Sequence, residues 1–150
     1  MRFVALLFGA VLMLAVVLAQ ADEPEYLHAP GVTPGSLPFS EAVRAGDLLF
    51  LSGMVGIDSE TRGLVEGGIQ PETRATLESV KAALERHGSG MDRVVKCNVF
   101  LADIAEWPAM NEVYVEFFPD NRPARTAVEA SALPLGARVE IACIGMIARQ

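Results

Sequence analysis

Apolar residues recur at every second position in several short stretches of the chain, a spacing typical of β-strands with one buried face. Gly46-Asp47 separates the first two stretches, so these predict a hairpin. In the third stretch, alternate residues from Val95 to Leu101 are expected to share a face. The stretches that predict strands are residues 42–44, 48–52, 94–101, 125–131 and 138–147.

Two other stretches have apolar residues three and four positions apart, as on the buried face of an α-helix. The first helix is expected to begin near Pro71 and to end at Gly88, since proline suits a first turn and glycine follows a last turn. The second is expected to begin between Asp103, a candidate N-cap, and Trp107. We interpret its Met/aromatic face as core: Trp107, Met110, Tyr114, Phe117 and Phe118.

The order of strands, helix, strand, helix and strands predicts an α+β fold, a mixed sheet packed on one face by two helices. The last two strands are apolar on both faces, so we expect the other face of the sheet to be buried against another subunit. Residues 22–37 are rich in Pro and Gly and are interpreted as an extended lead-in to one domain, residues 38–150.

The N-terminus has the pattern of a secretory signal peptide, residues 1–21. Arg2 precedes an apolar run over residues 3–18, and Ala19-Gln-Ala21 resembles a cleavage site. The alternative is a membrane anchor, for which the run is short and lacks a stop signal. We therefore expect export, into the periplasm, and no membrane association after cleavage.

Charge and histidine spacing exclude two kinds of partner. The net charge is −7 and no run of Lys or Arg occurs, so an acidic surface would repel nucleic acid. His28 and His87 are isolated, so no metal site is expected.

Two cysteines, Cys97 and Cys143, invite the prediction of a disulfide in an exported protein. Both lie in apolar strands, where a thiol packs as a small hydrophobe, and a bridge demands specific geometry. We therefore expect two buried thiols.

One carboxylate lies in an otherwise apolar strand. Glu140 is the only charged residue between Val139 and Ala148, and Arg125 opens the preceding strand. Because a buried, unpaired carboxylate costs several kcal/mol, we expect Arg125 on an adjacent strand to be its partner. The residues alone leave two interpretations: a structural ion pair, or a cation that grips a small carboxylate beside an acid/base group.

An ordered set of motifs resembles the RidA family, also called the YjgF/YER057c/UK114 family, over about residues 38–148. No single motif is decisive, but their order is specific. The motifs include Leu51-Ser52-Gly53 and Met110-Asn111. The strongest part is Pro123-Ala-Arg125 followed by Leu133-Pro134 and Val139-Glu140-Ile.

The resemblance implies a chorismate-mutase-like fold, a homotrimer with an inner β-barrel, and ligand clefts between subunits. It implies hydrolysis of 2-imino or enamine acids to 2-keto acids and ammonia without a cofactor. Arg125 would bind the substrate carboxylate and Glu140 would activate water, with Ser52 and Asn111 as polar cleft residues. Alternatively, Ser52 bonds a turn and Asn111 satisfies a buried peptide group.

Three positions depart from the family pattern. Phe39 replaces a common tyrosine, Met54 a frequent glutamine and Ala127 a frequent cysteine. Phe39 and Met54 would make the substrate-binding pocket less polar, which indicates a broader or more apolar substrate. The alternative function is a non-catalytic trimer of the same fold that binds small carboxylates.

Overall fold

The computed structural model describes residues 23–148. The predicted signal peptide, residues 1–21, lies outside this range and stays a prediction. Within the described range, no helix is long and apolar enough to cross a membrane.

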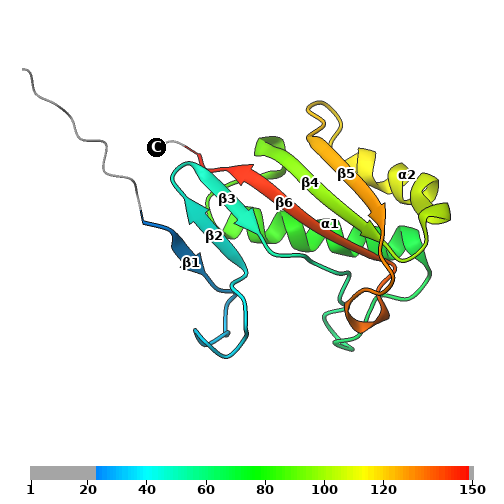
Figure 1. The fold of residues 1–150 in the computed structure, drawn as a ribbon, viewed down its shortest axis with the longest axis horizontal. Coiled ribbons are helices and arrows are strands. Elements are labelled where there is room, and N and C mark those ends of the chain that lie inside the picture. The colour runs from blue at the N-terminus through cyan, green and yellow to red at the C-terminus, as the bar shows by residue number, and fades with distance from the viewer. Residues whose placement is uncertain (1–22, 149–150) are drawn as a thin grey trace, which may run out of the picture.

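A six-stranded sheet, in the order β1-β2-β3-β6-β4-β5, forms the centre of the fold (Figure 1). β4 and β5 are parallel and the other neighbours are antiparallel, so the predicted mixed sheet is confirmed. The strands are β1 (Glu25–Leu27), β2 (Ala42–Ala45), β3 (Leu48–Leu51), β4 (Val94–Leu101), β5 (Ala124–Glu129) and β6 (Val139–Met146). The pattern of the lead-in did not predict β1.

Two helices, α1 (Ile69–Arg86) and α2 (Trp107–Phe117), lie on the same face of this sheet, as predicted (Figure 1). α1 begins two residues before Pro71. Asp103 caps a short 3-10 helix (Ile104–Glu106) that leads directly into α2, with its carboxylate accepting from the Ala105 amide at 2.9 Å. Two further 3-10 turns are Met91–Arg93 and Pro134–Gly136.

The face of β4 toward the helices differs from the prediction by one residue. A register irregularity between Val94 and Lys96 interrupts the pairing of β4 with β6. Because a β-bulge shifts the alternation of side chains, Val94 is buried and Val95 is 42% exposed. From Cys97 onward the predicted alternation holds, and Cys97, Val99 and Leu101 are in the core.

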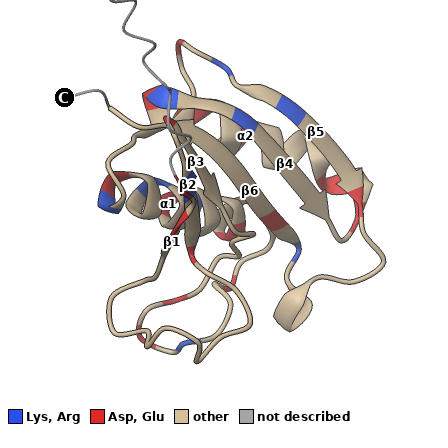
Figure 2. Ribbon diagram, turned by 60° about the vertical axis from the view of Figure 1, so that its left-hand side comes forward, with Lys and Arg blue, Asp and Glu red and all other residues tan. Residues whose placement is uncertain are grey.

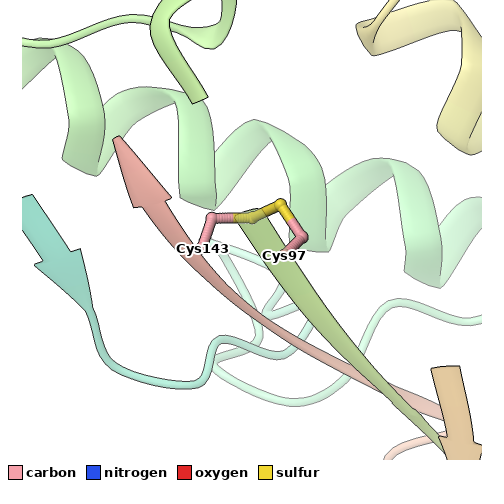
Figure 3. The surroundings of a disulfide bond; sticks show 2 residues. All are labelled: Cys97 and Cys143. Carbon is pink, nitrogen blue, oxygen red and sulfur yellow. A yellow bond between two sulfur atoms is a disulfide. The ribbon is translucent and has the colours of Figure 1, made fainter. Parts of the chain in front are cut away.

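The two cysteines are joined by a disulfide, so the expectation of two buried thiols is wrong (Figure 3). β4 and β6 are antiparallel neighbours, and their register places Cys97 directly opposite Cys143. The Cα atoms are 4.1 Å apart, close enough for a bridge. Both residues remain buried, against α1. The apolar surroundings suggested thiols, but only the strand pairing determined that they face each other.

A buried carboxylate at the start of α1 fixes the beginning of β6. Oε1 of Glu72 accepts hydrogen bonds from the amides of Arg138 at 2.7 Å and Val139 at 3.3 Å. Glu72 is 3% exposed, and these charge-assisted bonds offset the cost of burying it. The strand that carries Glu140 is thereby tied to α1.

None of the described helices lies on the second face of the sheet (Figure 1). Leu48, Phe50, Val128 and Met146 are each 37–42% exposed there. Several large apolar side chains exposed on one sheet face are typical of a protein–protein interface. This agrees with the expectation of a neighbouring subunit, which stays a prediction.

Candidate functional site

Arg125 is held against the helix layer by one face of α2. Its Nη1 donates to Asn111 Oδ1 at 2.6 Å, and its guanidinium carbon lies 4.6 Å from the ring centroid of Tyr114 and 5.8 Å from that of Trp107. The three α2 residues are spaced at i, i+4 and i+7, so they share a face of the helix. Asn111 therefore orients Arg125 through its side-chain oxygen.

This arrangement leaves the cation ready for an external anion. No carboxylate of residues 23–148 forms a salt bridge with Arg125. Stacking on aromatic rings and a hydrogen bond at one nitrogen fix the orientation of the planar guanidinium without neutralising its charge. Such a guanidinium suits bidentate binding of a small carboxylate.

The Tyr114 side chain, which packs against the Arg125 guanidinium, is uncharged. Burial raises the pKa of Tyr114 to about 12, and the charge of Arg125 opposes that rise. Its hydroxyl is buried and has no hydrogen-bond partner among the described residues. The ring therefore contributes its face to Arg125 as an uncharged phenol throughout the neutral pH range.

A pH titration of Tyr114 tests this burial. The only other tyrosine is Tyr26, so in a Tyr26→Phe variant all phenolate absorbance comes from Tyr114. We expect a midpoint at about 12 in the folded protein and at the ordinary 10.0 in denaturant. Because the folded state holds this proton more tightly, stability is expected to fall as pH rises from about 10 to about 12. A folded-state midpoint at the ordinary value would contradict the structure.

Glu140 lies on the opposite face of the sheet. It alternates with the buried residues Val139 and Ile141 and is itself half-buried. β6 bears no other charge along its length (Figure 2). Beyond β3, the backbone N–H and C=O of Met54 bond those of Ile141 at 3.0 Å each, so residues 52–54 lie beside Glu140.

Gly53 provides the space for the Glu140 carboxylate. A Cβ atom at Gly53 would lie 1.7 Å from Oε1 of Glu140, so any larger residue would displace the carboxylate. The Ser52 hydroxyl is hydrogen-bonded to the backbone, since its Oγ donates to the Ser40 carbonyl at 2.7 Å. This favours the structural interpretation of Ser52, although the oxygen can still accept a hydrogen bond.

A pocket of about 170 Å³ opens beside Gly53. Phe39, Ser52 and Met54, three residues singled out by the sequence, contribute to its lining. The sequence did not indicate its other lining residues, which come mainly from the lead-in and lack periodicity: His28, Ala29, Val32, Leu37 and Glu41.

The expected pairing of Arg125 with Glu140 on adjacent strands is wrong. β4 lies between β5 and β6, and its register places Arg125 beside Cys97 and Glu140 beside Phe100. Two strand spacings alone amount to about 10 Å. The two side chains also point to opposite faces, so one chain presents two separate half-sites.

No group of three or more His, Cys, Asp or Glu residues between 23 and 148 is placed to hold a metal ion.

The fold and these half-sites define a class of α+β protein with two helices on one face of a mixed sheet. Residues 32–147 match the family described as Endoribonuclease L-PSP, and the chain belongs to that family. This supports the resemblance to the RidA family seen in the sequence.

Two curated relatives cover most of the domain. A "RutC family protein", PH0854 of Pyrococcus horikoshii, is 44% identical over 107 residues, 71% of this chain and 85% of the relative. A protein of Dermatophagoides farinae named "2-iminobutanoate/2-iminopropanoate deaminase" is 40% identical over 110 residues, 73% of this chain and 86% of the relative.

Solved structures share the fold. RidA from an Antarctic Psychrobacter species superposes with a TM-score of 0.74 at 35% identity, covering 82% of this chain and 99% of that one. TdcF of E. coli, whose structure contains bound serine, has a TM-score of 0.73 at 27% identity over 83% of this chain and 100% of that one.

Proposed function

We propose that this protein hydrolyses 2-imino and enamine acids to 2-keto acids and ammonia. The observation that carries this proposal is Arg125, a guanidinium fixed by Asn111 and two aromatic rings with no carboxylate partner in the described part of the chain. The deaminase named among its relatives supports the reaction, and the serine bound to TdcF supports a small carboxylate as ligand.

In the proposed mechanism Arg125 binds the substrate carboxylate through two parallel hydrogen bonds. Glu140 accepts a proton from water as the water oxygen attacks the imine carbon. Glu140 passes this proton to nitrogen, which gives a carbinolamine. The hydroxyl proton of the carbinolamine then moves to nitrogen, the C–N bond breaks, and ammonia leaves as the carbonyl forms. One acid/base group contributes about 10²- to 10⁴-fold to such a rate. No step needs a cofactor.

We further propose that the complete site forms between copies of the chain. Arg125 and Glu140 project from opposite faces of one sheet, so they can meet only when neighbouring copies bring the two faces together. The apolar outer face, with Phe50 and Val128 exposed, fits such an association. A homotrimer with the sheets as an inner barrel is the assembly we propose.

Export to the periplasm is also a proposal. It is supported by the signal-like N-terminal pattern and by the disulfide between Cys97 and Cys143, since structural disulfides persist mainly in oxidising compartments.

The proposed function is tested with residues 22–150 and imines generated in situ by an amino-acid oxidase. Residual imine is trapped with semicarbazide. Arg125→Ala is expected to lower kcat/KM by about 30- to 5,000-fold, because truncating one partner of a charge pair costs about 2–5 kcal/mol. Arg122→Ala, which removes an exposed arginine three residues earlier, is the matched control and should leave the rate unchanged.

Turnover retained in Arg125→Ala would disprove this role. If the wild type does not accelerate imine loss but binds 2-keto acids in an Arg125-dependent manner, the alternative of a non-catalytic carboxylate-binding trimer is favoured.

A further inference from the structure

The pocket beside Gly53 lies close to the Glu140 carboxylate. Gly53 is one of the lining residues of the pocket, and its missing Cβ makes room for Oε1 of Glu140. A substrate whose reacting carbon is within reach of Glu140 therefore has this pocket next to it.

The wall of the pocket is mainly apolar. Five side chains without polar atoms other than the sulfur of methionine line it: Ala29, Val32, Leu37, Phe39 and Met54. Phe39 and Leu37 are 56% and 45% exposed, so these large apolar groups are available for contact.

Most polar groups of the lining are already satisfied by the protein. The two oxygens of Glu41 contact Arg86 at 2.6 Å and His87 at 2.8 Å, and Ser52 donates to a backbone carbonyl. His28 is the remaining polar side chain, and it is half-buried. A charged substrate group would lose its hydration here, and an acidic one would also face Glu41.

The size of the pocket indicates which side chains it can hold. Its volume is about 170 Å³. An apolar cavity of about 150 Å³ in another protein holds a benzene molecule. A phenyl ring or a branched four-carbon chain therefore fits, whereas a single methyl group would leave most of the pocket unfilled.

We infer that this pocket receives the side chain of the substrate and selects 2-imino acids with extended apolar side chains, up to the size of a phenyl ring. The inference rests on the proposed function and adds the substrate class to it. It differs from the two short substrates in the name of the mite relative.

The first measurement compares imines derived from leucine, phenylalanine, alanine and glutamate on the wild-type protein. One additional methylene in an apolar pocket is worth about 10- to 200-fold in discrimination. The leucine- and phenylalanine-derived imines are therefore expected to have kcat/KM values at least about 10-fold above the alanine-derived imine. The glutamate-derived imine is expected to be the poorest.

Two variants test whether the pocket causes the preference for large apolar side chains. Ala29→Phe fills it and is expected to lower kcat/KM for the phenylalanine-derived imine about 10-fold while leaving the alanine-derived imine within about 2-fold. Met54→Gln adds a polar group and should reduce the preference for the leucine-derived imine over the alanine-derived imine. Val115→Phe, a similar enlargement at a 39% exposed position of α2, is the matched control.

The outcomes separate this inference from the proposed function. Hydrolysis of every imine at the same rate, or fastest hydrolysis of the alanine-derived imine, overturns the inference and leaves the function intact. If no imine is hydrolysed, the function fails, and calorimetric titration with pyruvate, 4-methyl-2-oxopentanoate and phenylpyruvate decides the inference. Tighter binding of the two larger acids, lost in Ala29→Phe, supports it, and equal or weaker binding overturns it.

Discussion

Mixing Arg125→Ala subunits with Glu140→Gln subunits in equal amounts is expected to restore about a quarter of the wild-type imine hydrolysis. Each variant alone should be almost inactive. A site made of Arg125 from one copy and Glu140 from its neighbour is intact only when both contributing subunits carry the needed residue. With random assembly each condition holds for half of the sites, so about a quarter are complete.

The companion mixture combines the wild type with the double variant Arg125→Ala/Glu140→Gln. Sites shared between subunits again predict about a quarter of the activity, whereas sites within one chain predict about half. Subunits are mixed by refolding, and mass spectrometry of the intact assemblies confirms that hybrids have formed. Hybrids without activity from the two single variants would disprove the shared site.

Removing the disulfide is expected to lower the free energy of unfolding more than the other proposed substitutions do. The bridge closes a loop with a sequence separation of 46 residues. Chain entropy assigns such a loop about 4 kcal/mol of stabilisation at room temperature. A Cys97→Ala/Cys143→Ala variant should therefore show a much lower denaturant midpoint at fixed protein concentration. Each single variant should cost nearly as much, because either one breaks the same bond.

The wild type treated with reductant during unfolding is the control, since it loses the bond but keeps both side chains. Its midpoint should match that of the double variant to within the small cost of two buried sulfur atoms. Two thiols found by alkylation of the unfolded, unreduced protein would show that the bridge is absent.

The disulfide also links the strands on which the half-sites depend. Cys97 lies beside Arg125 in the parallel pair of β4 and β5, and Cys143 is three residues after Glu140 on β6. We expect the loss of the bridge to affect both half-sites only through the general loosening of the sheet.

Local patterns in the sequence predicted the elements well. The alternation at residues 94–101 corresponds to β4 with the predicted bounds. The turn signal at Gly46-Asp47 corresponds to the β2–β3 hairpin. These features depend on neighbours a few residues away, which the sequence displays directly. The bulge near Val94 escaped prediction because it arises from the pairing with β6.

The candidate site was predicted in part. Arg125 and Glu140 were singled out by the charge pattern of their strands, and Asn111, Phe39 and Met54 by the family resemblance. Trp107 and Tyr114 were assigned to the core, which is wrong for Trp107, since this residue is 43% exposed. Their role beneath the guanidinium became visible only when α2 was placed beside β5. Spacing at i, i+4 and i+7 with Asn111 was the signal that could have indicated it.

The sequence by itself determined the order and type of most elements, the unusual carboxylate at Glu140 and the family. The tertiary structure alone decided that β6 lies between β3 and β4, which pairs Cys97 with Cys143 and separates Arg125 from Glu140. Periodicity is a local property that each segment carries with it. Strand order depends on how distant segments bury their apolar faces together, and no single segment encodes that choice.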